Sequence, residues 1–133
     1  MRTINRLLVT FCLGLAVFGC TKNDNKGGYE GPTVDAFHGK VTHNGKPVKF
    51  AENEEVQLTL FHEKGQQFGI PLTADGTFEI GWMPTGKYSI MVERTAQIPN
   101  KGATKTRYSV PDGLTIEEGK KDYVIELGKN FKP

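Results

Sequence analysis

Three histidines are the side chains in this sequence with the greatest capacity for metal chemistry, because imidazole is a common metal ligand. His38 and His43 lie five residues apart, and on an extended strand an odd spacing directs two side chains to opposite faces. His62 stands at the end of a separate alternating segment. A zinc site needs three or four ligands that converge on one point. We therefore interpret the histidines as solvent-facing or rim residues, and we predict no metal site and no bound cofactor.

Residues that could support nucleophilic or acid–base catalysis are present, but without the context that this chemistry needs. Ser89 and Ser109 lack the Gly-x-Ser-x-Gly pattern that exposes a nucleophilic serine on a sharp turn. The adjacent carboxylates Glu54–Glu55 and Glu117–Glu118 lie beside expected turns, where charged side chains are ordinarily solvated. The sequence thus predicts no catalytic residue, and we expect that the protein is not an enzyme.

Cys20 has a context that points to acylation. An apolar run spans residues 7–18, and Arg2 and Arg6 precede it. The run has the length of a signal-peptide core and falls short of the roughly 20 residues that span a bilayer. The stretch VFGC at residues 17–20 resembles the lipobox of bacterial lipoproteins, in which the cysteine is diacylated and becomes the new N-terminus. This resemblance implies a lipoprotein signal peptide over residues 1–19 and a lipid anchor on Cys20.

An ordinary signal peptide cleaved elsewhere is the alternative, and it would leave Cys20 as an incidental thiol. The only other cysteine, Cys12, lies inside the expected signal peptide, so the mature chain would have no partner for a disulfide. Two or more acyl chains hold a protein stably to a membrane. Thr21 follows the cysteine, where enterobacterial lipoproteins kept in the inner membrane have Asp. We therefore expect anchoring in the cell envelope, to the outer membrane or the cell surface, facing outside the cytoplasm.

The charge of the expected mature chain argues against nucleic acid as a partner. The full sequence has 17 basic and 15 acidic side chains, and Arg2 and Arg6 supply the whole excess of +2. From Cys20 onward the basic and acidic residues are therefore equal in number, and Lys and Glu are interspersed. A nucleic-acid-binding protein normally has a concentrated basic patch.

Two regions are candidates for binding. Trp82 lies beside the expected turn at Pro84, where it could form an apolar tip for a sugar or a protein, or could cover the end of the core. The segment 95–107 is expected to be a loop, and its basic residues Lys101, Lys105 and Arg107 could bind an acidic partner. The alternative is a surface loop whose charges are only solvated.

The rest of the chain divides into three segments. Residues 20–33 are polar and rich in Gly and Asn, and they cannot bury enough apolar surface to offset the entropy of ordering. We interpret them as a lipidated flexible tether. Residues 34–128 form one domain, and residues 129–133 are a C-terminal tail.

The domain has the pattern of short strands. Turn signals such as Asn44-Gly45, Asp75-Gly76 and Pro84-Thr85-Gly86 punctuate it, and no segment sustains a helical period. Apolar residues alternate at Phe37, Gly39 and Val41; Val56, Leu58 and Leu60; Phe68, Ile70 and Leu72; Phe78 and Ile80; Tyr88, Ile90 and Val92; Leu114 and Ile116; and Tyr123, Ile125 and Leu127. This pattern predicts an all-β, antiparallel, Ig-like β-sandwich of about seven strands. Pro71 cannot donate to a ladder, so we expect its strand to lie at an edge or to end there.

Several of these stretches resemble known domains. GKVTHNGKPV at residues 39–48, DGTFEI at 75–80 and MPTGKYSI at 83–90 resemble transthyretin-like, carboxypeptidase-regulatory-like sandwich domains. The segment from Ile98 to Leu127 is similar to small lipoproteins found in planctomycetes. The resemblance implies a transthyretin-like fold in a lipid-anchored protein. It does not imply one function, because sandwiches of this kind host many.

We expect a non-catalytic structural or protein-binding module of the cell envelope. Its partners would be the membrane, through Cys20, and an envelope protein or glycan that the sequence does not identify. The alternative is an accessory domain that binds a carbohydrate or small molecule through loops at the strand ends. An exposed Trp82 beside a polar groove would favour the alternative, and a buried Trp82 would favour the first interpretation.

Overall fold

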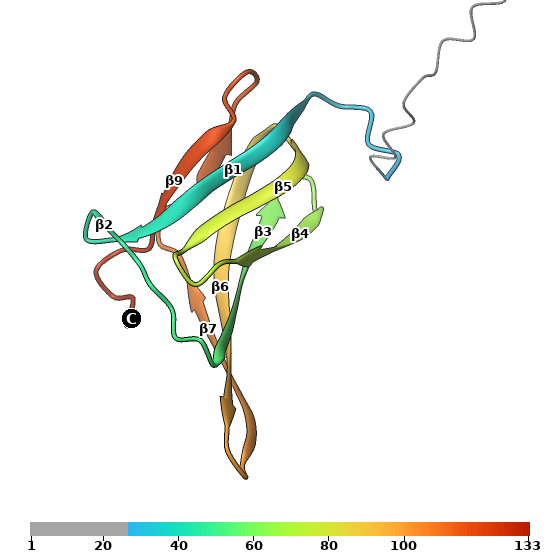
Figure 1. Ribbon diagram of the computed structural model, residues 1–133. Coiled ribbons are helices and arrows are strands. Elements are labelled where there is room, and N and C mark those ends of the chain that lie inside the picture. The colour runs from blue at the N-terminus through green and yellow to red at the C-terminus, as the bar shows by residue number, and fades with distance from the viewer. Residues whose placement is uncertain (1–26) are drawn as a thin grey trace, which may run out of the picture.

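The computed structural model describes residues 27–133, so Cys20 and the expected signal peptide lie outside the described part of the chain (Figure 1). Within this range the chain is all-β and has no helix. No helix long and apolar enough to cross a membrane therefore occurs in residues 27–133. The nine strands are β1 (Thr33–His43), β2 (Lys46–Pro47), β3 (Glu54–His62), β4 (Gln67–Leu72), β5 (Thr77–Pro84), β6 (Gly86–Ile98), β7 (Gly102–Ser109), β8 (Leu114–Ile116) and β9 (Asp122–Glu126).

The strands form two sheets that face each other as a β-sandwich. In the four-stranded sheet, β1 pairs antiparallel with β5 and β2, and parallel with β9. In the five-stranded sheet the order is β4-β3-β6-β7, and β8 pairs with the beginning of β6. The expected all-β sandwich is therefore confirmed. Two strands were not predicted: the very short β2, and β7.

The turn after β1 shows how local sequence sets the register. Asn44 has a φ of 53° and Gly45 has a φ of 75°, and together they connect His43 to its partner Lys46. Two successive residues with positive φ give the hairpin turn whose twist matches that of paired strands, and Asn-Gly is its preferred sequence. The predicted hairpin turn at Asn44-Gly45 is confirmed.

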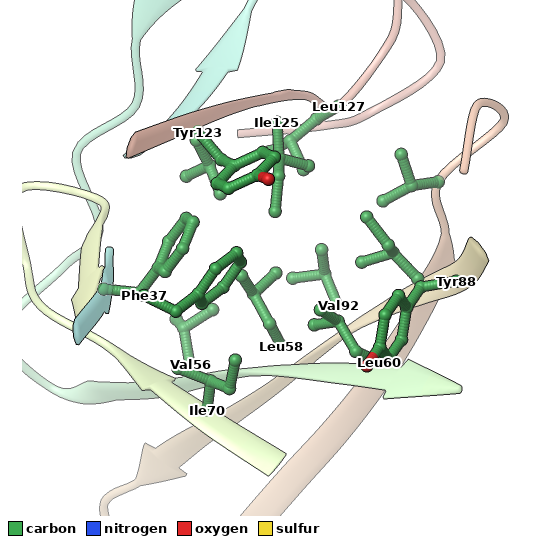
Figure 2. Close-up of a cluster of buried hydrophobic side chains, with 14 of the residues drawn as sticks. Phe37, Val56, Leu58, Leu60, Ile70, Tyr88, Val92, Tyr123, Ile125 and Leu127 are labelled. Carbon is green, nitrogen blue, oxygen red and sulfur yellow. The ribbon is translucent and has the colours of Figure 1, made fainter. Parts of the chain in front are cut away.

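The hydrophobic core lies between the sheets. Figure 2 shows side chains of β1, of β9 and of the residue after β9 facing those of β3, β4 and β6. The labelled residues are Phe37, Tyr123, Ile125 and Leu127 on one side, and Val56, Leu58, Leu60, Ile70, Tyr88 and Val92 on the other. The Phe37 ring lies 5.0 Å from that of Tyr123 and 5.4 Å from that of Phe78, between centroids. Gly39 faces the same interior, and its missing side chain leaves the space that the Phe78 ring and the Tyr123 carbonyl occupy. The predicted alternation of buried residues is confirmed in these strands.

The edge position of β4 is also as predicted. Its only sheet partner among residues 27–133 is β3, and Pro71 lies opposite Gln57. In the β3–β4 ladder His62 N donates to Gln66 O, so the even-numbered residues of the two strands form the hydrogen-bonded pairs. Pro71 is odd-numbered and therefore belongs to a non-hydrogen-bonded pair. The missing N–H of Pro71 therefore costs the sheet no hydrogen bond.

One predicted loop is wrong. Residues 95–107, which we call the arm, form the end of β6, a turn and most of β7. Asn100 and Gly102 take positive φ values of 64° and 82° in the turn. Because β3 begins only at Glu54, β6 and β7 continue beyond it as a two-stranded hairpin, which protrudes from the sandwich at the bottom of Figure 1.

The chain enters the sandwich at the end opposite the arm. Pro32 O accepts a hydrogen bond from Thr85 N at 3.0 Å, and Thr33 pairs with Pro84 at the end of β5. At the other end of the chain the core continues through Phe131, which is buried. The N-terminal segment and the arm thus mark opposite ends of the folded domain (Figure 1).

Candidate functional site

The arm carries three of the four predicted binding residues. Lys101 lies in its turn, whereas Lys105 and Arg107 lie in β7 rather than in a loop. Lys105 and Arg107 are separated by one residue, so their side chains share one face of the strand. On that face both meet Glu93 of β6: Lys105 Nζ lies 2.8 Å from Oε1, and Arg107 Nε donates to Oε2 at 2.9 Å. The structure therefore brings two of the four predicted residues together.

Glu93 sets the electrostatics of this face. The hydrogen bonds from Lys105 and Arg107 hold the pKa of the Glu93 carboxyl below its ordinary value, so it is a carboxylate at neutral pH. In this contact one carboxylate faces two cations, and Glu55 of β3 lines the same face together with Glu93 and Lys105. The side chains of Lys105 and Arg107 are 51% and 61% exposed, so both remain accessible to a partner.

The opposite face of the arm borders a cleft of about 490 Å³. Its walls come from the inner face of the arm and from the C-terminal segment, and they include Ala96, Thr104, Thr106, Tyr108 and Phe131. These side chains are small, hydroxylated or aromatic. The cleft could therefore take an apolar side chain of a partner and offer it hydroxyl groups at the rim.

Arg94 lines this cleft and connects the elements that surround it. Its guanidinium lies 5.6 Å from the ring centroids of both Phe50 and Phe131. It donates two hydrogen bonds to the Glu54 carboxylate, at 2.8 and 2.9 Å, and one to Lys132 O at 2.7 Å. Nη2 donates to both carboxylate oxygens and Nη1 donates to the Lys132 carbonyl, while the planar guanidinium lies against the aromatic rings. Arg94 thus joins β3, β6 and the C-terminal segment.

Trp82, the fourth predicted residue, lies elsewhere. It belongs to β5 and is half-buried, between Tyr29 from the N-terminal segment and Phe68 from β4. The Tyr29 ring stacks on the indole with 6.5 Å between centroids and an interplanar angle of 24°, and Phe68 meets it edge-on at 6.0 Å. Trp82 lines neither the cleft of the arm nor the groove described next. It is at the chain's entry to the sandwich, away from Lys105 and Arg107.

A second depression lies on the outer face of the four-stranded sheet. This groove has a volume of about 890 Å³, and its lining includes His38, Lys40, Glu79, Asp122 and Val124. His38 of β1 has Glu79 of β5 and Asp122 of β9 as its direct cross-strand neighbours, and its Nε2 lies 3.9 Å from Asp122 Oδ1. Sequence reasoning missed this groove, because the order β5-β1-β9 brings together residues that no local pattern connects.

His62 was predicted to be a solvent-facing or rim residue, and this was wrong. Its side chain is buried beside Tyr88, and both ring nitrogens have partners: Nε2 lies 2.9 Å from Thr85 O, and Nδ1 accepts a hydrogen bond from Lys64 N at 3.1 Å. Because Nδ1 accepts, Nε2 carries the proton and donates to the Thr85 carbonyl. Across residues 27–133, no cluster of three or more His, Cys, Asp or Glu side chains could hold a metal ion.

No protein-family model matches this sequence, and a comparison with curated proteins finds no match either.

Proposed function

We propose that the protein is a lipid-anchored, non-catalytic binding module of the cell envelope, held to the membrane by acylated Cys20 and carrying a transthyretin-like sandwich. The arm, together with its cleft, would be the surface that contacts a partner protein. The signal-peptide pattern and the VFGC stretch support the anchor. The two-sheet architecture and the turns at Asn44-Gly45 and Asp75-Gly76 agree with the transthyretin-like resemblance.

One observation supports this function above the others: the chain enters the sandwich at the end opposite the arm (Figure 1). Tyr29 lies nine positions after Cys20, so an extended chain places the domain within about 30 Å of its anchor. A domain anchored from the Tyr29 end presents the arm away from the membrane. A partner in the envelope would therefore meet the arm first.

The groove beside His38 favours a second candidate function, the binding of a carbohydrate or other small polar molecule. A concave site with a few convergent polar groups is the usual setting for such a ligand. This groove has side chains of both charges, in Lys40, Glu79 and Asp122, next to the exposed apolar side chain of Val124. Trp82, at the entry of the chain, takes no part in it.

The anchor is tested by expressing the full chain in a bacterial host and measuring intact mass and membrane partitioning. We expect a mature product that begins at Cys20, is heavier by a diacylglycerol and an acyl group, and stays with the membrane. Cys20→Ser should lose both properties, whereas Cys12→Ser, in the expected signal peptide, should keep them. An unlipidated soluble wild-type product would overturn the proposed anchor.

The orientation of the domain needs a separate measurement. A fluorophore is attached to a cysteine introduced by Asn100→Cys in the arm, or by Glu30→Cys near the entry of the chain. Energy transfer to acceptor-labelled lipids is then compared in reconstituted vesicles. We expect weaker transfer from position 100 than from position 30, and equal transfer would contradict the proposed presentation of the arm.

A further inference from the structure

The outer edge of β7 is an unpaired sheet edge. Among residues 27–133 this strand pairs only with β6, because β8 returns to β6 rather than to β7. With the bounds Gly102–Ser109, β7 is eight residues long, and all of its residues except Tyr108 are exposed. An edge of this kind presents backbone N–H and C=O groups in a row, ready to pair with another strand.

The register identifies the unpaired backbone groups. Val110 N donates to Ile90 O, so in the β6–β7 ladder the even-numbered residues form the bonded pairs. The hydrogen bond from Gln97 N to Asn53 O shows that the odd-numbered residues of β6 bond to β3, which agrees with this assignment. The N–H and C=O groups of Ala103, Lys105 and Arg107 therefore point away from β6.

The other edges of the two sheets are less suited to pairing. β4 has Pro71, which cannot donate a hydrogen bond from its free side. β9 has only five residues, Asp122–Glu126, and β2 has two. β5, at an edge of the four-stranded sheet, has eight residues but ends in Pro84. β7 is as long as β5, and it contains no proline. Part of it also lies in the arm, outside the body of the sandwich (Figure 1).

Charge indicates what kind of strand would pair there. Residues 95–111 contain three cationic side chains, Lys101, Lys105 and Arg107, and no acidic one, and the carboxylate that Lys105 and Arg107 contact is that of Glu93. A second copy of this chain that paired edge to edge through β7 would bring its own Lys105 and Arg107 against the same residues. Like charges on facing positions of paired strands are destabilising. Self-association is therefore disfavoured, and an acidic strand is favoured.

A strand added to β7 would place its alternate side chains over the two faces of β7. A strand paired to β7 lies about 4.8 Å from it, and its side chains alternate between the two faces. On the outer face they would meet Lys105 and Arg107. On the inner face they would meet Thr106 and Tyr108, which border the 490 Å³ cleft. The matching sequence alternates acidic residues with apolar ones.

We propose that β7 binds an extended segment of a partner protein in which acidic and apolar residues alternate, by adding that segment as a further strand of the five-stranded sheet. This inference rests on the proposed function as a binding module and gives the chemistry of its partner. Main-chain hydrogen bonds from Ala103, Lys105 and Arg107 would supply pairing, and the outer face and the cleft would supply specificity.

The test measures binding of a fluorescent ten-residue peptide of alternating Glu and Val to the full-length, purified protein in detergent, by anisotropy. We expect saturable binding that weakens as salt increases. The double variant Lys105→Gln/Arg107→Gln should bind at least tenfold more weakly, whereas Lys120→Gln/Lys121→Gln should bind as the wild type does. Ala103→Pro removes an outward N–H without changing charge, and it should also weaken binding about tenfold. Ala103→Ser keeps that N–H and is its matched control.

A second readout is amide hydrogen exchange, which should slow at Ala103, Lys105 and Arg107 when the peptide binds. Binding that is unaffected by Ala103→Pro, or equal binding of the anionic polysaccharide polygalacturonate, would overturn strand addition in favour of charge attraction alone. Absence of peptide binding to the wild type would also overturn it.

The intact mass of the same sample separates the two proposals. A lipidated protein that binds no peptide contradicts only the pairing with β7, and an unlipidated protein that binds the peptide contradicts only the anchor.

Discussion

The carboxylate of Glu126, on the last strand, accepts a 2.7 Å hydrogen bond from Oγ1 of Thr42, on the first strand. The same carboxylate accepts the N–H groups of Asn44, at 2.8 Å, and Gly45, at 3.1 Å. A fourth hydrogen bond comes from Gly128 N at 3.2 Å. One side chain of β9 thus satisfies both positive-φ residues of the β1–β2 turn, and it connects that turn to the C-terminal strand.

This arrangement predicts that the free energy of unfolding depends on pH in the acidic range. The hydrogen bonds from the Thr42 hydroxyl and from the backbone N–H groups of Gly45, Asn44 and Gly128 lower the pKa of Glu126 from its ordinary 4.5 to about 2 in the folded protein. A lowered pKa stabilises the fold where the carboxylate is ionised in both states, above about pH 4.5, and this stabilisation is lost as pH falls toward 2. We expect the stability difference between wild type and Glu126→Gln to vanish over that interval. Denaturant unfolding at a series of pH values measures it, with the exposed Glu118→Gln as the control that shows no such loss.

Arg94 should contribute measurably to stability, unlike the other arginine of the domain. Its side chain and that of Glu54 are only 19% and 17% exposed, and it is stacked between two aromatic rings. Truncation to Ala leaves the Glu54 carboxylate without the guanidinium that donates to both of its oxygens, which should lower the free energy of unfolding by about 2 kcal/mol. Arg107→Ala, at a 61% exposed position, should change it by less than about 0.5 kcal/mol. Equal effects in chemical denaturation would contradict the role given to Arg94.

The phenol of Tyr88 predicts a response to alkali. Its hydroxyl donates to Pro84 O at 2.6 Å, and burial raises the pKa of Tyr88 above its ordinary value of 10. Because the unfolded chain ionises first, the contribution of this phenol to stability is complete below pH 10 and is lost as pH rises above it. Tyr88→Phe should lower the free energy of unfolding at pH 7 by about 1–2 kcal/mol, since it leaves a buried carbonyl unpaired. It should also remove part of the alkaline decline, and unfolding curves from pH 7 to 11 test both points.

Gly39 and Gly81 make a matched pair for packing. A Cβ at Gly39 would overlap the Tyr123 carbonyl and lie 2.7 Å from Phe78 Cζ, whereas one at Gly81 would meet no atom within 4 Å. We expect Gly39→Ala to lower the free energy of unfolding by about 3 kcal/mol, through strain in the β1–β9 pairing. Gly81→Ala should be neutral, or stabilising by up to about 1 kcal/mol, because it restricts the unfolded chain. Thermal unfolding of the two variants compares them directly.

Tyr29 should control the accessibility of Trp82, which is the only tryptophan in the chain. Tyr29→Ala removes the ring that stacks on the indole, so acrylamide should quench the fluorescence more efficiently and the emission should shift to the red. The loss of stability should be about 1 kcal/mol, as for other aromatic pairs. Tyr108→Phe, on the other side of the sandwich, should leave the quenching unchanged. Unchanged quenching in Tyr29→Ala would show that the N-terminal segment does not cover Trp82.

The strands with alternating apolar residues could be predicted from the sequence, because a sheet with one buried face imposes a period of two. The Val56–Leu60 and Tyr88–Val92 segments show this, and their turns carry the Gly and Asn residues that positive φ requires. The arm could not be predicted in the same way. Neither face of its projecting part is in the core, so no face requires apolar residues, even Ile98 is exposed, and the period disappears. Strand pairing with β6, rather than burial, defines β7.

The sites were harder to predict because they depend on distant contacts. Lys105 and Arg107 were found from their charge, but their partner Glu93 lies on another strand. The burial of His62 depends on Thr85 O, 23 positions later in the chain. The groove beside His38 depends on the lateral order of three strands. Cys20 lies outside the described residues, so its acylation stays a prediction.

The parallel pairing of β1 with β9 has a consequence for how the chain can fold as it emerges from a ribosome or a translocation pore. Every residue from His38 to Thr42 has its partner between Asp122 and Glu126, so the centre of the four-stranded sheet cannot close until almost the whole chain is available. Contacts of such long sequence separation also slow folding. A chain delivered from its N-terminus could therefore not complete its four-stranded sheet until β9 has been released.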